Sequence, residues 1–585
     1  MRPTSEDRNP AAEHRETSTG GGSAPGNGDG AVGEGSATSA SQNTEGPALD
    51  QPIGQMGRIV GSGMALMVVA TVTNKLMTML AQWVLGAKLS AEDFAVFAYA
   101  TAIAGFTMVC REAGIRELLV QRGEKQYESL VGTGFWLALV YNLVVSAVMA
   151  LIALPLAHVL KQPLLAPMLW VIAAALPIGT LGGILQTSMR LHLRFRDFAA
   201  NTLLGSFTRQ GSMIFFALRG MGAMSLAWPV LVGTIFEAIG AYLRTRDPLW
   251  KRPAETARWP GLLRDSKWLM FASVANFAVD WGPFLLMGAI TALSQVQSGP
   301  LAGVAKAFSL TDREAGIFYF AFMITAQVGV LLSFNLSLVL TPALARLNDD
   351  PQRLASGVLR SLRTLMLAGS IGSLGLACVI EPLQHLLWPP AKGDLVGKWH
   401  AAVPAVIILG IFFPWRITFG VSASMLQAQG RFRLYALLTA IEGGGLTLFT
   451  VIGAFVEPTA TMMAWWAGGW LLVSRLVLTL WVMRTIRVSW FDVLASTFPA
   501  WLAAVIAAGC GLGTIRLPWA AWIGPTHPRV IDAVSMVVAG CVCVLVFTVL
   551  CRTVLRSHLV EVLAVTPVRL RGIAARVLLL PVPEE

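Results

Sequence analysis

The sequence is poor in charged residues. Only 13% of its 585 residues are Asp, Glu, Lys or Arg, whereas a soluble globular domain carries about 25%. Hydrophobic residues make up 55%, and the mean hydropathy is +0.63. An ordinary soluble domain is therefore excluded. The apolar residues also occur in blocks of about 20, the length that an α-helix needs to cross a bilayer.

Cysteine and histidine are scarce as well. The six cysteines all fall within or at the ends of apolar blocks, and the seven histidines are scattered without an H-E-x-x-H pair. No G-x-x-x-x-G-K-[ST] loop is present, which argues against ATP hydrolysis by this chain. The sequence thus predicts no disulfide framework, no metal site, no cofactor and no catalytic residues.

Residues 1–50 have a different composition from the rest. They are rich in Gly, Ser, Ala, Asn and Glu and carry almost no large apolar side chain. Such a segment cannot bury enough surface to offset the entropy of ordering, so we expect a disordered polar tail. Its start lacks the basic, apolar and small-residue pattern of a secretory signal.

The long unbroken apolar blocks predict helices, because the strands of a membrane barrel would alternate over about ten residues. We therefore expect an all-α polytopic membrane protein with about fourteen transmembrane helices. The predicted spans lie near 61–85, 92–111, 130–153, 168–189, 200–218, 222–243, 268–290, 314–340, 361–380, 401–425, 434–455, 460–483, 494–514 and 530–551.

The distribution of basic residues predicts the orientation. With residue 58 in the cytoplasm, the inside loops and tails hold 28 Lys and Arg residues and the outside loops hold 9. Missing or inventing one span midway would destroy this bias. We expect both termini in the cytoplasm and the chain in the cell inner membrane. The net charge of +11 then reflects orientation and contact with membrane lipids, and does not imply nucleic acid.

Short matches recur at nearly constant offsets along the chain. They are Arg194-Phe195-Arg196 and Arg431-Phe432-Arg433 at 237, Gln121-Arg122 and Gln352-Arg353 at 231, and Ala95–Ala100 and Gly316–Ala321 at 221. The repeat unit is six spans, so the two halves have the same orientation and form two lobes facing a central cleft, where alternating access would occur.

This duplication predicts the division of the chain. We expect a polar tail (1–50), an N-terminal six-helix lobe (57–243), a cytoplasmic linker (244–267), a C-terminal six-helix lobe (268–490), two extra transmembrane helices (491–551) and a cytoplasmic tail (552–585). In that last tail, the segment 569–580 is expected either to form an amphipathic interfacial helix or to remain frayed.

Four short motifs resemble those of a known family. They are Leu89-Ser90-Ala91-Glu92-Asp93-Phe94, Arg194-Phe195-Arg196-Asp197-Phe198, the pair Pro342–Leu347 and Asp350–Leu354, and Gln429-Gly430-Arg431. With them the chain resembles the polysaccharide branch, which includes O-antigen-type flippases, of the multidrug/oligosaccharidyl-lipid/polysaccharide flippase superfamily. The first motif corresponds to the family's L-(S/T)-x-x-D-F-(G) loop, with Ala95 in place of the usual Gly. The polar tail and an insertion at 291–312 depart from the family pattern.

The resemblance implies a function. Such proteins move an undecaprenyl-pyrophosphate-linked glycan from the cytoplasmic to the outer leaflet, in the assembly of lipopolysaccharide or other surface polysaccharide, beside a polymerase machinery. Without an ATP-binding loop, the energy would come from a coupling cation or proton, from the membrane potential or from removal of the product outside.

Charged side chains inside spans are costly, so they indicate candidate sites. The basic ones are Lys75, Arg209, Arg416 and Arg475, and the acidic ones are Glu237, Asp280 and Glu442. One interpretation is a cationic lumen that binds the pyrophosphate, since guanidinium matches phosphate oxygens. The other is structural, with Arg–Glu pairs joining helices or long side chains reaching an interface.

Three polar side chains complete the candidate lumen. Asp280 is expected either to neutralise Lys75 or to carry a coupling cation. Asn74 and Asn276 are candidates for binding sugar hydroxyls, although hydrogen bonds between helices are the commoner use of Asn in membranes.

Two rival functions remain open. A multidrug extruder of the same superfamily would share the twelve-span core, but a cavity for cationic drugs would be acidic, and here the deep charges are more often basic. A membrane glycan polymerase, ligase or glycosyltransferase would carry catalytic groups on a large outside loop. The largest outside loops, near 291–313 and 381–400, are short, which favours a transporter over an enzyme.

Overall fold

The computed structural model describes residues 53–110, 115–192, 194–294, 310–346, 350–389, 398–523 and 528–556. The predicted polar tail, most of the 291–312 insertion and the tail beyond residue 556 lie outside the described residues. Within these ranges every regular element is a helix. The predicted all-α membrane fold is confirmed.

Among the described residues, fourteen helices are twenty or more residues long, and they match the predicted spans one to one. The first six are α1 (Ile53–Lys88), α2 (Ala91–Cys110), α3 (Ile115–Val159), α4 (Leu165–Leu191), α5 (Phe195–Leu218) and α6 (Met224–Thr245). The next six are α7 (Trp259–Ser294), α9 (Asp312–Arg346), α10 (Pro351–Leu387), α11 (Val403–Ala428), α12 (Phe432–Val456) and α13 (Ala460–Arg484). They are followed by α14 (Trp490–Ile515), the short α15 (Trp519–Ile523) and α16 (Pro528–Val554). By length and composition, ten of the described helices qualify as membrane spans.

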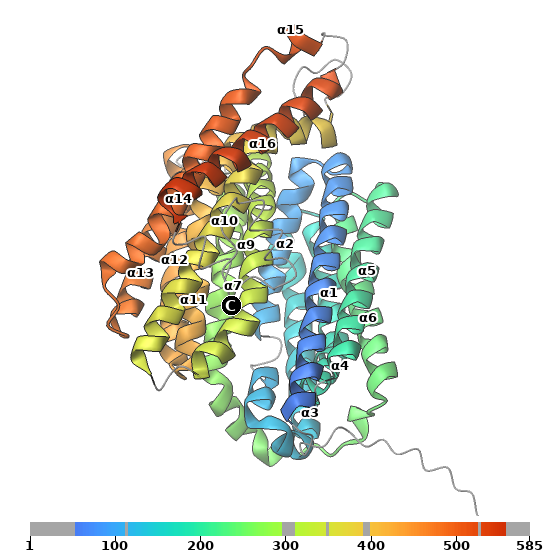
Figure 1. Cartoon of the computed structure of the whole chain (residues 1–585). Coiled ribbons are helices and arrows are strands. Elements are labelled where there is room, and N and C mark those ends of the chain that lie inside the picture. The colour runs from blue at the N-terminus through green and yellow to red at the C-terminus, as the bar shows by residue number, and fades with distance from the viewer. Residues whose placement is uncertain are drawn as a thin grey trace, which may run out of the picture. The chain divides into compact units, whose positions relative to one another are not determined.

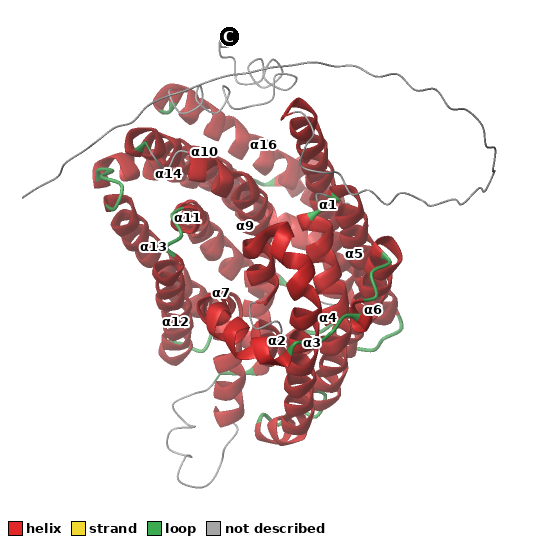
Figure 2. Ribbon diagram, turned by 90° about the horizontal axis from the view of Figure 1, so that it is seen from below, coloured by secondary structure: helices red, strands yellow, loops and turns green. Residues whose placement is uncertain are grey.

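The two sets of six helices pack in the same order. In the first lobe α1 packs on α5, α5 on α6, α6 on α4, and α4 on both α2 and α3. In the second lobe α7 packs on α12, α12 on α13, α13 on α11, and α11 on both α9 and α10. Figures 1 and 2 show the two groups side by side. The packing therefore repeats the duplication that the sequence matches predicted.

One hydrogen bond is repeated in both lobes. The Asp93 carboxylate at the start of α2 accepts from the backbone N–H of Ala223, just before α6, at 3.0 Å. The Glu314 carboxylate at the start of α9 accepts from the backbone N–H of Ala460, at the start of α13, at 2.8 Å. These residues are related by the offsets 221 and 237 of the sequence matches. In each lobe an acidic side chain thus caps an N-terminus, where unpaired N–H groups favour negative charge.

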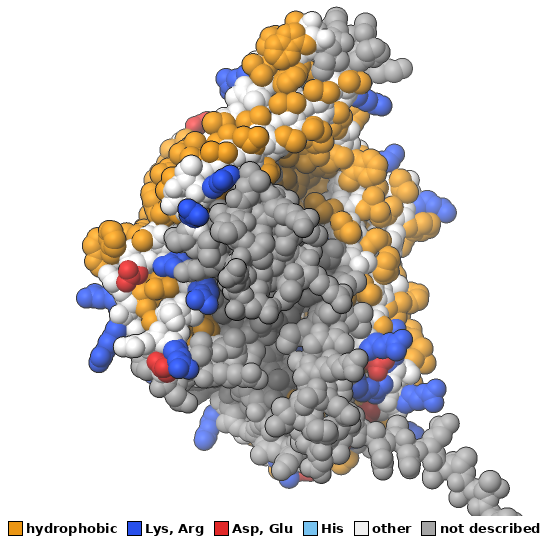
Figure 3. Space-filling model, viewed as in Figure 1, with side chains coloured by type: hydrophobic (Ala, Val, Ile, Leu, Met, Phe, Trp, Pro, Cys, Tyr) orange, Lys and Arg blue, Asp and Glu red, His pale blue; other side chains and the backbone are white. Residues whose placement is uncertain are grey.

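Helix α2 joins the lobes, since it packs on both α7 and α9. Helices α14 and α16 pack on each other and on α10, at the edge of the second lobe (Figure 2). Hydrophobic side chains cover much of the described surface over α14 and α16 (Figure 3), as expected where helices contact lipid.

The connection between the lobes is shorter than the expected 244–267 linker, because α7 already begins at Trp259. Two short 3₁₀ helices, η1 (Leu249–Lys251) and η2 (Thr256–Arg258), lie in it. Arg252 anchors this connection through ion pairs with Glu128 of α3 at 2.6 Å and with Asp247 at 2.9 Å.

Candidate functional site

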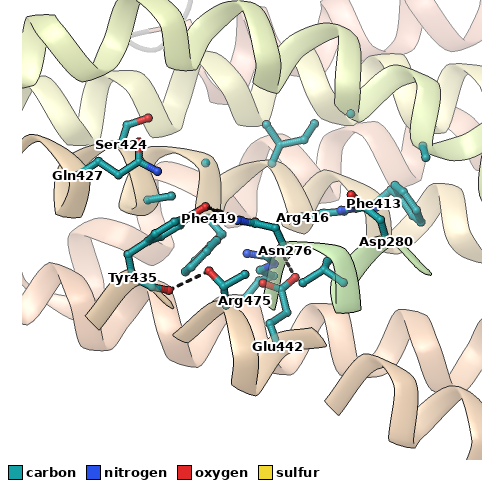
Figure 4. A pocket seen from close by; sticks show the side chains of 17 residues that line it. Asn276, Asp280, Phe413, Arg416, Phe419, Ser424, Gln427, Tyr435, Glu442 and Arg475 are labelled. Atoms are coloured by element: carbon teal, nitrogen blue, oxygen red, sulfur yellow. Dashed lines mark hydrogen bonds and ion pairs between the residues drawn. The ribbon is translucent and has the colours of Figure 1, made fainter. Parts of the chain in front are cut away.

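A pocket of about 400 Å³ lies inside the second lobe, and we call it the central pocket (Figure 4). It is lined by Asn276, Val279, Asp280, Ala326, Gly329, Phe413, Arg416, Ile417, Phe419, Gly420, Ala423, Ser424, Gln427, Tyr435, Thr439, Glu442 and Arg475. These side chains come from α7, α9, α11, α12 and α13. The pocket reaches from the middle of α11 to the end of the bundle where α11 ends and α12 begins, which we call the Arg431 end.

Arg416 and Asp280 form an ion pair in the wall of the central pocket. Arg416 comes from the middle of α11, and its guanidinium lies 5.7 Å from the ring centre of Phe322 and 5.6 Å from that of Phe413. Asp280 comes from α7, and its side chain is 51% exposed, against 19% for Arg416. The two aromatic rings hold the cation in place, while the carboxylate is open to the pocket.

A second ion pair, between Arg475 of α13 and Glu442 of α12, lies behind the first. Their side chains are 5% and 0% exposed. The Arg475 guanidinium also lies 4.3 Å from the ring centre of Phe419. Its Nε and Nη1 atoms are buried and have no hydrogen-bond partner among the described residues. Arg475 is among the residues that line the pocket, but these two donor atoms are not exposed to it.

Asn276 and Tyr435 form a polar contact on the Arg431 side of the two ion pairs. The Asn276 amide donates to the Tyr435 hydroxyl at 2.9 Å, and this hydroxyl lies 3.2 Å from the amide oxygen. Asn276 precedes Asp280 by four residues, so both side chains lie on one face of α7. The pocket therefore offers a carboxylate, a guanidinium, an amide and a phenol at one surface.

The central pocket is balanced in charge, since it holds two arginines and two carboxylates. One interpretation of the sequence is a cationic lumen, whereas this pocket holds as many carboxylates as guanidinium groups. The structural alternative, Arg–Glu pairs that join helices, describes Arg475 and Glu442. Arg416 fits both interpretations, because its ion pair joins α11 to α7 while the carboxylate of its partner Asp280 is half exposed to the pocket.

Arg209 lies elsewhere, in the first lobe. It faces Glu237 at 3.9 Å between α5 and α6, with side chains 43% and 28% exposed. A small cavity of about 60 Å³ adjoins this pair, and Gln186 of α4 donates a hydrogen bond to Glu237. In the second lobe the equivalent helices α12 and α13 hold the Glu442–Arg475 pair. Each lobe therefore has an ion pair between its fifth and sixth helices, with the basic and acidic partners on opposite helices in the two lobes.

Lys75 and Asn74 are not among the residues that line the central pocket. The Lys75 ammonium donates to the side-chain oxygen of Gln327 at 2.8 Å, which joins α1 to α9 across the two lobes. Asn74 is half buried on α1. The expected pairing of Asp280 with Lys75 is wrong, because the Asp280 carboxylate contacts Arg416 instead.

At the opposite end of the bundle the lobes are in direct contact. We call it the Lys88 end, where α1 ends and α2 and α9 begin. Three side chains of the second lobe donate hydrogen bonds to carbonyls at the C-terminus of α1 or just after it. They are Trp388 to Trp83 at 2.8 Å, Trp399 to Gly86 at 2.9 Å, and Lys398 to Leu89 at 2.5 Å and Ala87 at 3.2 Å. A helix C-terminus has unpaired carbonyls and a negative dipole end, so it suits such donors. Burial lowers the pKa of Lys398, and the nearby Asp93 opposes this shift.

Further contacts seal the Lys88 end. The Asp312 carboxylate of the second lobe accepts from the Tyr99 hydroxyl at 3.1 Å and from the Gln162 amide at 2.7 Å, both in the first lobe. Gly316 at the start of α9 lies so close to α2 that a Cβ there would stand 1.9 Å from the carbonyl oxygen of Ala91. Glycine allows the two helices to meet at this point.

Sequence reasoning missed several of these residues. Tyr435 lies in the apolar block that follows the Arg431 motif, and its partner Asn276 is 159 positions away. Trp388, Lys398 and Trp399 follow span 9 as an ordinary outside loop. No spacing pattern relates them to the C-terminus of α1, so only the folded chain shows the contact.

Comparisons with known proteins show which folds and which family this chain is similar to. The family model described as "Polysaccharide biosynthesis protein" matches residues 60–298. The lipid II flippase MurJ in an inward closed conformation matches with a TM-score of 0.60 and 11% identity, covering 84% of this chain and 100% of that one. A share of 84% of 585 residues is about 491 residues, which is more than the 484 residues up to the end of α13. The match therefore includes residues beyond α13.

Two other solved structures share the fold. An inward-facing multidrug resistance MATE family transporter of the MOP superfamily matches with a TM-score of 0.51 and 13% identity, over 72% of this chain and 98% of that one. A MOP superfamily transporter from Pyrococcus furiosus, described as having a binding pocket of reverse polarity, matches with a TM-score of 0.50 and 15% identity, over 72% and 95%. No curated protein matches the chain. The resemblance to this superfamily is confirmed.

Proposed function

We propose that this protein is a flippase, with no enzymatic activity of its own, that moves a lipid-linked oligosaccharide across the inner membrane during surface polysaccharide assembly. One combined observation carries the proposal. The polysaccharide family model matches the first lobe and the start of the second, and the lipid II flippase matches over its whole length and past α13. The MATE transporter above covers a smaller share of this chain.

The arrangement of the two ends supports alternating access. The basic-residue bias supports an orientation with the Arg431 end in the cytoplasm and the Lys88 end outside. With the contacts between the lobes at the Lys88 end formed and the central pocket reaching the Arg431 end, cargo would enter the pocket from the cytoplasm. Breaking the contacts at the Lys88 end and closing the Arg431 end would release the cargo into the outer leaflet. A coupling cation or the membrane potential would drive the cycle.

The central pocket suits the polar part of such a cargo. Arginine binds phosphate oxygens with paired, charge-assisted hydrogen bonds, and Arg416 is held at the pocket wall. Asn276 and Tyr435 offer donors and acceptors to the first sugar. The undecaprenyl chain would remain in the bilayer, because its apolar surface gains nothing from leaving hydrocarbon. In this proposal Lys75 acts at the boundary between the lobes, and Arg209 acts within the first lobe.

The test is Arg416→Ala in a strain that depends on this protein for surface polysaccharide. We expect surface polysaccharide to fall at least about tenfold, since the charge-assisted contacts of the diphosphate are lost. Arg353→Ala is the matched control, because Arg353 is 78% exposed at the start of α10 and away from the pocket. Normal polysaccharide with stably inserted Arg416→Ala protein would overturn the assignment of this pocket.

Drug extrusion is the second candidate, since the inward-facing MATE transporter shares the fold. A deletion strain separates the two functions. The flippase proposal expects loss of surface polysaccharide with unchanged sensitivity to cationic drugs. Raised drug sensitivity with intact polysaccharide would instead establish extrusion.

A further inference from the structure

The two ion pairs of the central pocket differ in how freely they can exchange partners. Glu442 is completely buried, so breaking its contact with Arg475 would leave a carboxylate in an apolar interior, at a cost of several kcal/mol. Asp280 is half exposed, so its carboxylate can leave Arg416 and be solvated in the pocket. Arg475 is therefore permanently paired, whereas Arg416 has a partner that can be replaced.

The surroundings of Arg416 favour replacement of its partner while the arginine itself stays in place. Its guanidinium lies 5.7 Å and 5.6 Å from the ring centres of Phe322 and Phe413, and neither of these contacts involves Asp280. Further polar groups line the same pocket, namely the Asn276 amide and the Tyr435 hydroxyl. An anion with several oxygens would contact more of these donors than a single carboxylate does.

We propose that Asp280 is a displaceable counter-ion, which occupies Arg416 in the empty transporter and gives it up to a diphosphate. The proposal rests on the proposed function, of which it describes the binding step. In the empty state the carboxylate satisfies a guanidinium that would otherwise be an unpaired charge at mid-membrane depth. In the loaded state the diphosphate takes its place. When the diphosphate leaves, Asp280 returns to Arg416 and so competes against rebinding.

Competition makes a specific and unusual prediction. Removing the charge of a pocket residue should strengthen binding, because the anion no longer has to displace a carboxylate. For Asp280→Asn we expect geranyl pyrophosphate to bind about tenfold more tightly than to the wild type at low ionic strength. Product release should slow accordingly, so surface polysaccharide should fall even though binding improves.

The experiment measures geranyl pyrophosphate and inorganic pyrophosphate binding to the full chain in lipid nanodiscs. Asp280→Ser provides a second variant without the charge if Asp280→Asn is unstable. Asp197→Asn is the matched control, since Asp197 pairs with Arg194 at 2.8 Å outside the pocket. In the double variant Asp280→Asn/Arg416→Gln the gain should disappear, as expected if the two residues are energetically coupled.

The outcomes separate the two proposals. If the wild type binds neither diphosphate, the flippase site itself is wrong. If the wild type binds, and Asp280→Asn and Asp280→Ser bind equally or more weakly, only the counter-ion role is overturned. If Asp197→Asn tightened diphosphate binding as much as Asp280→Asn, the counter-ion role would also be overturned, since the effect would then come from net charge alone. Binding of inorganic pyrophosphate without geranyl pyrophosphate would indicate a site for the soluble anion and would contradict the lipid-linked source.

Discussion

The ion pairs of the two lobes allow a stability prediction with an internal control. Glu442→Gln leaves the Arg475 charge in a site where its side chain is only 5% exposed. Removing one partner of a buried pair costs about 3–5 kcal/mol, because the remaining charge is neither solvated nor neutralised. Glu237→Gln is the same chemical change in the equivalent helix pair, but Arg209 is 43% exposed and 3.9 Å away. An exposed pair contributes about 0–1 kcal/mol.

The two variants should therefore differ by at least about 2 kcal/mol, a factor of roughly 30 in the ratio of folded to unfolded protein. The assay is equilibrium unfolding by SDS in mixed micelles, followed by tryptophan fluorescence. A double variant, Glu442→Met/Arg475→Met, should recover most of the loss, since well-packed apolar residues often replace a buried pair without cost.

Two results would refute this reasoning. If Glu442→Gln and Glu237→Gln were equally mild, water would have to reach Arg475, and its burial would not have the energetic consequence that we assign to it. If the double methionine variant were as unstable as Glu442→Gln, the loss would come from packing at these positions and not from the unpaired charge.

Two further predictions concern the contacts between the lobes. Gly316→Ala should open the Lys88 end, because the new Cβ would stand 1.9 Å from the Ala91 carbonyl oxygen; we expect faster maleimide labelling of Leu85→Cys in a cysteine-free background. Gly375→Ala is the control, because no atom lies within 4 Å of the added Cβ, and it should leave the labelling rate of Leu85→Cys unchanged. If Gly316→Ala left this rate as slow as Gly375→Ala does, a lobe contact at Gly316 would be contradicted. Trp399→Phe keeps a ring but removes the 2.9 Å hydrogen bond to Gly86, so it should weaken the closed state by about 1 kcal/mol and raise labelling about fivefold. A rate equal to that of the wild type would show that this bond does not hold the end closed.

Much of the architecture follows from the sequence alone. The fourteen long helices match the fourteen apolar blocks, because a lipid-exposed segment must satisfy its own backbone hydrogen bonds and so shows its length in its composition. The duplication is visible in short matches because both lobes need the same turns at the same ends. The same offsets, 221 and 237, relate the hydrogen bond between Asp93 and Ala223 to the hydrogen bond between Glu314 and Ala460.

Which charges meet is a matter that only the tertiary structure decides. A charged residue inside an apolar block can be recognised from the sequence alone. The sequence therefore identified seven such residues, which are Lys75, Arg209, Arg416, Arg475, Asp280, Glu237 and Glu442. Their partners depend on which helix faces are in contact and on the rotation of each helix, and composition does not report either. Asp280 therefore paired with Arg416 of α11 and not with Lys75.

The tertiary structure also decides how exposed each of these pairs is. Arg475 and Glu442 are buried in the packing of α12 against α13, whereas Asp280 faces the central pocket. In sequence all of these residues look alike, as single charges among apolar neighbours. Their different roles arise because burial sets the cost of separating two charges, and burial is a property of the packed lobe and not of the chain.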